Sequence, residues 1–265
     1  MEFWLLYLLT GAVAGVLAGL LGVGGGLVIV PALTAIFTAQ HFPPETILHL
    51  ALGTSLASIL FTAISSARKH HAHGAVNWVV LRGITPGIVT GTLLGASLAT
   101  LLSSGFLKGF FVVFIYYVAV QMLFDLRPGG ARPLPGKAGL FLAGGVIGVV
   151  SSLVGIGGGT LSVPFMTWCR IRMIDAIGTS SAIGFPIAAA GAIGYIANGW
   201  GTPGLPVYSL GFVYLPALAG LVLTSVLTAP LGAKAAHRLP VQRLKKLFAL
   251  FLVLIGTRML LSSFQ

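Results

Sequence analysis

Apolar segments long enough to cross a lipid bilayer recur along the whole chain, separated only by short loops. They cover residues 3–21, 46–66, 83–102, 106–124, 138–154, 174–197, 209–233 and 244–262. A bilayer core about 30 Å thick requires about 20 helical residues. Only 7% of the 265 residues are charged, against roughly 25% in soluble domains, so polar groups could not cover a water-exposed surface. The sequence therefore predicts an all-α polytopic membrane protein.

Basic residues outnumber acidic ones, and the net charge is +11. Because Lys and Arg are typical of the short cytoplasmic loops of membrane proteins, we expect contact with membrane lipid and no nucleic-acid partner. The run RKHHAH at 68–73 has no cysteine or carboxylate nearby. We place it in a cytoplasmic loop and predict no metal site and no cofactor.

Two halves of the sequence repeat one pattern. The motif GVGGG at 22–26 returns as GIGGG at 155–159, a shift of 133 residues, and a Val-Pro pair follows each copy. A shift of 125 aligns two Gly-Thr-Ser motifs, and a shift of 137 aligns the regions after them. Ordered shifts that differ only by loop lengths indicate a duplication. We predict a first transmembrane repeat at 1–126, a cytoplasmic linker rich in Pro and Gly at 127–136, and a second repeat at 137–265.

The positions of the basic residues bear on the direction of each repeat. If the glycines only interrupt a span, each half crosses four times and the basic residues divide almost evenly between the two sides. If the chain turns back there, all 15 Lys and Arg residues except Lys108 and Arg258 fall on one side, as the positive-inside rule requires. We therefore predict two inverted repeats, each a glycine-broken helical hairpin plus three transmembrane helices, and both termini outside the cytoplasm.

The segments after the glycines, 27–38 and 160–169, are too short to cross a bilayer alone. Whether they cross as part of a broken pair or re-enter stays open, which leaves 8–10 membrane segments. Inverted repeats with broken helices are typical of secondary transporters that bind substrate near the membrane centre. A helix that starts at each break would direct free N–H groups at an anion. The alternative is ordinary glycine-mediated helix packing. The candidate binding residues are Gly24, Gly25, Gly26, Leu27, Gly157, Gly158, Gly159 and Thr160.

Hydroxyl side chains form a second repeated motif, Thr54-Ser55 and Thr179-Ser180. These hydroxyls could donate to a substrate oxygen, or they could bond to backbone and join helices. His49 is the histidine that we place inside a span, where a relay role competes with simple solvation near the membrane edge. The four carboxylates fall at membrane edges or loops, which argues against a cation substrate. They are Glu2, Glu45, Asp125 and Asp175.

The paired GxGGG…VP motifs, each followed by a Thr-Ser segment, and the closing LPVQRLKKLFALFLVLIGTRMLL resemble the TauE/SafE family of sulfite exporters. The resemblance covers nearly the whole chain. It implies a permease that exports a small anion such as sulfite or an organosulfonate. The motif glycines of the family fall on Gly22 and 24–26 and on Gly155 and 157–159, and its Thr-Ser pairs fall on those named above.

We therefore expect a multi-pass protein of the bacterial inner membrane that exports a small anion by alternating access around a central site formed by the two breaks. A passive anion channel is the alternative, because the same glycine-lined helix ends would serve a pore. An enzyme is disfavoured, since no HExxH motif and no buried acid is present. A homodimer is compatible with this prediction, although no motif requires one.

Overall fold

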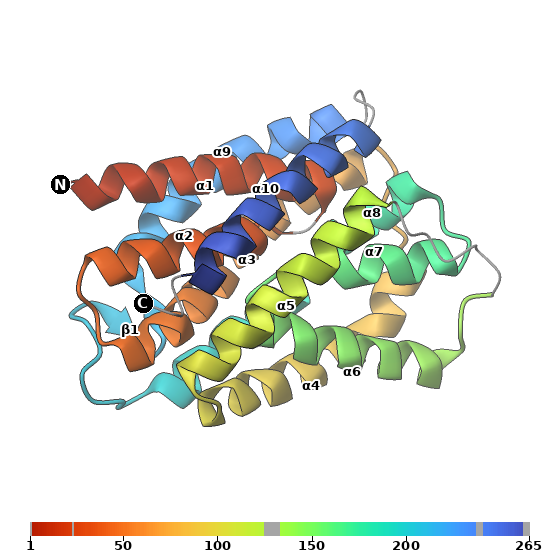
Figure 1. The fold of residues 1–265 in the computed structure, drawn as a ribbon. Helices are drawn as coiled ribbons and strands as arrows, with labels where there is room; N and C mark the ends of the chain where they lie inside the picture. The colour runs from red at the N-terminus through yellow and green to blue at the C-terminus, as the bar shows by residue number, and fades with distance from the viewer. Residues whose placement is uncertain (1, 23, 125–132, 237–240, 262–265) are drawn as a thin grey trace.

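Ten helices and one short β-hairpin make up the part of the chain that the structure describes (Figure 1). This computed structural model describes residues 2–22, 24–124, 133–236 and 241–261, with the side chains of Glu2 and of residues 241–245 excepted. The elements are α1 (Glu2–Leu21), α2 (Gly26–Ala39), α3 (Pro44–Ala72), α4 (Trp78–Leu101), α5 (Ser104–Leu123), α6 (Lys137–Val154), α7 (Gly159–Trp168), α8 (Met173–Gly199), β1 (Ser209–Leu210), β2 (Val213–Tyr214), α9 (Leu215–Ala236) and α10 (Val241–Leu261). The all-helical prediction is confirmed.

Seven helices within the described ranges are long and apolar enough to cross a membrane, namely α1, α3, α4, α5, α6, α8 and α9. Helix α10 has 21 residues, but the side chains of its first five residues are not among those that the structure describes. Helices α2 and α7 have only 14 and 10 residues. At a rise of about 1.5 Å per residue, neither can span a bilayer core by itself, as the sequence predicts.

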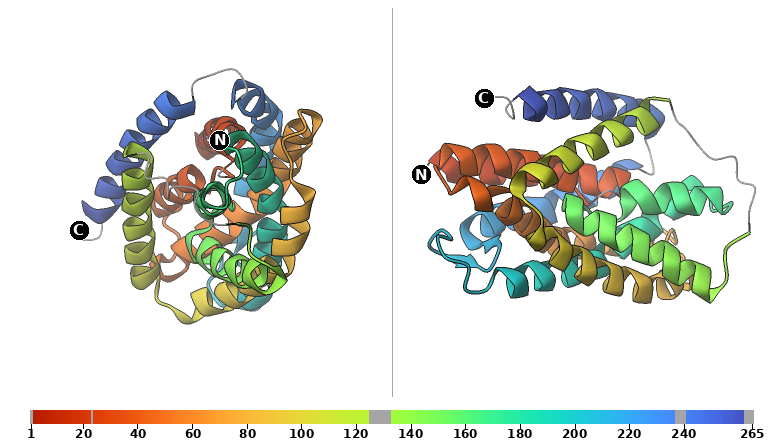
Figure 2. Two further views of the ribbon diagram at one scale, coloured as in Figure 1. Left: turned by 90° about the vertical axis from the view of Figure 1, so that its right-hand side faces the viewer. Right: turned by 60° about the horizontal axis from the view of Figure 1, so that its bottom comes forward.

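Helices α3 and α8 form the centre of the bundle, with 83% of an 18-residue apolar stretch of each helix buried. They pack on each other, α1 packs against α9, and α4 packs against α6 (Figure 1). Helices α5 and α10 contact each other on the outside of the bundle (Figure 2). Large apolar side chains on the outer helices are exposed, including Leu94, Val113 and Leu142. Such an apolar outer surface fits lipid as its solvent.

Small residues let the outer helix pairs approach closely. Gly11, Gly15 and Gly19 recur every fourth residue on α1, and a Cβ at Gly15 would lie 2.7 Å from the Cα of Ser225 in α9. In the α4–α6 pair, a Cβ at Gly91 would lie 2.8 Å from the Cα of Gly145. Lipid supplies no hydrophobic drive between helices, so this close backbone packing stabilises the pairs.

Three element boundaries differ from those expected. Helix α3 continues to Ala72, so the first five residues of the RKHHAH run lie in its last turns rather than in a loop. Helix α9 begins at Leu215 because residues 209–214 form the hairpin. Helix α4 begins at Trp78, where the Asn77 side chain accepts from the N–H groups of Val79 and Val80. Of the expected linker 127–136, residues 127–132 lie outside the described residues.

Candidate functional site

Each glycine motif ends one helix and starts another. After α1, Gly22, Gly24 and Gly25 have φ values of 69°, 80° and 81°, and Gly155 at the end of α6 has 67°. These left-handed conformations cost glycine little. The chain then reverses: α2 runs back toward the start of α1, on the left of Figure 1, whereas α7 lies toward the right. Both short helices therefore begin near the middle of the bundle.

The two glycine breaks lie directly against each other. A Cβ on Gly24 would lie 2.9 Å from the Cα of Gly157. One on Gly26 would overlap the carbonyl oxygen of Gly155 and lie 2.7 Å from the Cα of Ile156. Backbone segments from the two halves are thus in contact, and only glycine permits this approach. The structure brings the two sequence motifs together.

The first turns of α2 and α7 have matching hydrogen bonds. Val28 and Ile29 donate to the carbonyl of Gly25, and Leu161 and Ser162 donate to the carbonyl of Gly158. The preceding N–H groups, those of 26–27 and 159–160, have no carbonyl of their own helix within reach, as at every helix N-terminus. Both positive helix ends therefore lie where the two halves meet.

Buried hydroxyls without a hydrogen-bond partner among the described residues gather around the second break. Ser151 lies in the last turn of α6, and Thr160 and Ser162 lie in the first turn of α7. Their exposed fractions are at most 3%. A buried hydroxyl with no partner costs about 1–3 kcal/mol. Such donors beside a helix N-terminus are suited to a polar guest.

The serines of the two Thr-Ser motifs each reach the break of the other half. Ser55 of α3 donates to the carbonyl of Gly155 at 2.7 Å, and Ser180 of α8 donates to the carbonyl of Gly22 at 2.8 Å. Both carbonyls belong to the residue that directly follows α1 or α6, and carbonyls at a helix C-terminus lack a partner within the helix. Each serine therefore caps the broken helix of the opposite half.

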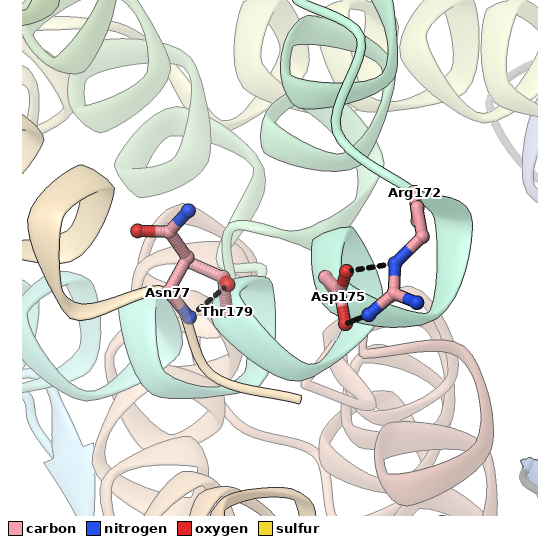
Figure 3. Close-up of polar contacts among 4 residues, drawn as sticks. All are labelled: Asn77, Arg172, Asp175 and Thr179. Atoms are coloured by element: carbon pink, nitrogen blue, oxygen red, sulfur yellow. Dashed lines mark hydrogen bonds and ion pairs between the residues drawn. The ribbon is translucent and has the colours of Figure 1, made fainter. Parts of the chain in front are cut away.

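The threonines make a second matched pair of contacts. Thr54 accepts a hydrogen bond from the N–H of Tyr214 at 2.9 Å, and Thr179 accepts one from the N–H of Asn77 at 2.8 Å (Figure 3). Tyr214 directly precedes α9, and Asn77 directly precedes α4. All four motif hydroxyls thus bond to backbone and join elements, which is the alternative left open by the sequence. Each threonine still has its own O–H proton to donate.

A small cavity among the described residues touches the first break. Its volume is about 10 Å³, and it is lined by Gly22, Gly24, Thr62, Ser66, Ser181 and three small neighbours. That is room for about one water molecule. A cavity of about 560 Å³ opens between α2, α3 and α5, but none of the candidate residues line it. The cavity beside Gly22 and Gly24 is therefore too small for a polyatomic anion.

His49 is buried, which argues against simple solvation, one of the two readings that the sequence leaves open. Its exposed fraction is 7%. Nδ1 lies 3.2 Å from the carbonyl oxygen of Glu45, and Nε2 lies 3.1 Å from that of Ala99. Sequence spacing does not indicate the second contact, because the end of α4 brings Ala99 to this position.

The carboxylates whose side chains are described lie at helix starts. Glu45 and Asp175 occupy the first turns of α3 and α8, where a negative charge is stabilised. Asp175 accepts from Arg172 at 2.7 and 3.2 Å (Figure 3), which raises the pKa of that guanidinium. The side chain of Glu2 and all of Asp125 lie outside the described residues.

The histidines at the end of α3 do not form a metal site. His70 is buried with Nε2 3.0 Å from the carbonyl oxygen of Gly19, and His71 packs edge-on to Trp78. No cluster of His, Cys, Asp and Glu suited to a metal ion occurs in the described part of the chain.

Known proteins resemble this chain over almost its full length. The family model described as "Sulfite exporter TauE/SafE" matches residues 7–259. A Haemophilus influenzae protein described as "Probable membrane transporter protein" is 40% identical over 264 residues, 98% of each chain. A similarly described protein of Methanocaldococcus jannaschii is 27% identical over 260 residues, 97% of this chain and 95% of its own. No solved structure matches. The chain therefore belongs to the TauE/SafE sulfite exporter family, as a multi-pass membrane transporter and not an enzyme.

Proposed function

We propose that this transporter exports a small anion, sulfite or an organosulfonate, by alternating access around a site formed by the two glycine breaks. The contact between Gly24–Gly26 and the Gly155–Gly157 backbone carries the proposal, because it places two helix N-termini at one point. The N–H groups of Gly25, Gly26 and Leu27 and those of Gly158, Gly159 and Thr160 bind the anion. The unpartnered hydroxyl of Thr160 supplies a further donor.

The two halves are inverted repeats in this proposal. Its support is the reciprocity of the contacts between halves: Ser55 and Ser180 exchange helix caps, and Thr54 and Thr179 exchange loop contacts. The short helices α2 and α7 extend toward opposite ends of the bundle (Figure 1). A twofold axis in the membrane plane relates segments in this way.

Alternating access requires the closed breaks to open toward one side at a time. The cavity of about 10 Å³ beside Gly22 and Gly24 is too small for sulfite, so in this proposal the contact between the halves widens when the anion binds. The caps made by Ser55 and Ser180 keep each broken end attached to the opposite half during that movement. Thr54 and Thr179 directly precede these serines in the sequence, and the proposal includes their hydroxyls in the binding site.

Counterflow separates a carrier from a channel. Purified protein in proteoliposomes loaded with unlabelled sulfite is expected to accumulate external radiolabelled sulfite transiently, with a saturable rate. Taurine, sulfoacetate and acetate are compared as exchange partners to define the substrate class. Conductance without counterflow would establish the channel instead. Absence of flux for every small anion would contradict the proposal.

Opposite orientation of α3 and α8 is tested by labelling. In a Cys169→Ala background, cysteines are placed at two exposed positions, Ala72→Cys at the C-terminal end of α3 and Val207→Cys after α8. Inverted repeats predict that a membrane-impermeant maleimide labels Val207→Cys in intact cells, whereas Ala72→Cys requires opened cells. Labelling of both from the same side would instead show parallel repeats.

A further inference from the structure

Helix α3 carries polar residues at every fourth position through the protein interior. Thr54, Ser58, Thr62, Ser66 and His70 lie on one face, and their exposed fractions are at most 2%. The last turns of α3 around His70 are basic, with the exposed Arg68 and with Lys69 directly before it. We define the hydroxyl stripe as Ser58, Thr62 and Ser66, together with the facing Ser181 of α8 and Ser225 of α9.

The hydroxyls of the stripe bond to each other and to carbonyls of their own helices, since Thr62 donates to the Ser58 carbonyl and Ser181 to the Ile177 carbonyl, each at 3.1 Å. Thr62 lies 2.9 Å from the Ser225 hydroxyl, and Ser66 donates to the Ser181 hydroxyl at 3.3 Å. The Ser58 hydroxyl is fully buried and has no partner among the described residues. While the two hydroxyls of such a pair are in contact, they satisfy each other's hydrogen-bonding capacity. When they separate, their O–H groups can turn and donate to an anion.

The stripe leads to the breaks. Thr62, Ser66 and Ser181 line the small cavity that Gly22 and Gly24 also line. A cavity with hydroxyls on one wall and break glycines on the other connects the stripe to the helix N-termini. The adjoining basic end of α3 then provides an electrostatic entrance for anions.

The corresponding positions in the other half are apolar. A shift of 125 residues carries Ser58, Thr62 and Ser66 onto Ile183, Ile187 and Gly191 of α8. The counterpart of Ser181 is Leu56, which occupies the space beside Gly191. A Cβ on Gly191 would lie 2.7 Å from the Cδ1 atom of Leu56. Packing of this fold therefore does not require hydroxyls at these positions, and their presence in one half needs another reason.

We propose that the hydroxyl stripe is the route by which the anion moves between the glycine breaks and the basic end of α3, and that the Ser66–Ser181 and Thr62–Ser225 pairs close it. This inference rests on the proposed function, since it names the path to that same site. The apolar counterpart around Leu56 and Gly191 seals the other half in this conformation. The route is thus asymmetric although the scaffold is duplicated.

Thr62→Val tests the route because it removes the hydroxyl and preserves the shape. Loss of one donor to a charged substrate predicts a fall in counterflow of about tenfold, and Ser66→Ala should behave similarly. Thr228→Val is the matched control, since the Thr228 hydroxyl bonds across helices to the Ala12 carbonyl at 3.0 Å but lies outside the stripe. Equal flux in Thr62→Val and Thr228→Val would overturn the route.

Cysteine labelling gives a readout that does not depend on flux or on the valine variant. In the Cys169→Ala background, a maleimide should label Thr62→Cys and Ser66→Cys about tenfold faster than Phe61→Cys on the lipid face or Ile183→Cys on α8, because thiols react as hydrated thiolates. Equal rates at all four positions would overturn the route. If the wild-type protein shows this labelling pattern but no anion flux, the proposed function is refuted. A hydrated path along the stripe would still be supported.

Discussion

Replacement of Gly26 by alanine is expected to lower anion counterflow about 100-fold, the effect of displacing binding groups by about 1 Å. The added Cβ would overlap the Gly155 carbonyl oxygen and lie 2.7 Å from the Cα of Ile156. Both neighbours are backbone atoms, so no side-chain rotation relieves the contact. The two breaks must separate, and their N–H groups then no longer point into one site.

The control is Gly109→Ala, a glycine inside α5 with nothing within 4 Å of its added Cβ. Alanine favours a helix over glycine by about 1 kcal/mol, so this variant should retain both fold and flux. Gly24→Ala, whose Cβ would lie 2.9 Å from the Cα of Gly157, should match Gly26→Ala in transport. Thermal unfolding in detergent separates loss of transport from loss of fold. A folded Gly26→Ala protein with wild-type counterflow would refute the shared site.

The sequence predicts the helices well because bilayer thickness sets their length. Apolar runs of about 20 residues could hardly form anything else in lipid, and glycine motifs mark where α1 and α6 end. Boundaries set by local polar contacts were harder to predict. The Asn77 cap that starts α4 and the hairpin that delays α9 depend on residues outside the apolar runs.

Contacts between the halves could not be predicted from sequence. The Thr-Ser motif identifies Ser180 as unusual, but its acceptor, the carbonyl of Gly22, lies 158 residues away and carries no side-chain signal. The burial of His49 depends in the same way on Ala99, 50 residues away. The hydroxyl stripe is different, since its four-residue period can be read from the sequence. Periodicity alone does not distinguish a conduit from hydroxyls that join helices.

Ser55→Ala and Ser180→Ala test the two helix caps that join the halves. Each removes the side-chain donor to a buried carbonyl at the end of a broken helix, Gly155 in one case and Gly22 in the other. An orphaned buried acceptor costs about 1–3 kcal/mol, so each variant should lose that much stability against unfolding in detergent. Because the two bonds are reciprocal, the two losses should be nearly equal.

Thr100→Ala serves as the control, since its exposed hydroxyl bonds only within its own turn, to the carbonyl of Ser97, and surface changes of this kind usually stay within about 0.5 kcal/mol. The double variant is more informative than either single one. If both caps hold one interface between the halves, their losses should couple by about 0.5 kcal/mol or more, and counterflow should fall further than in either single variant. Strictly additive losses with unchanged counterflow would mean that the caps stabilise two separate helix ends and that the breaks do not move as one unit.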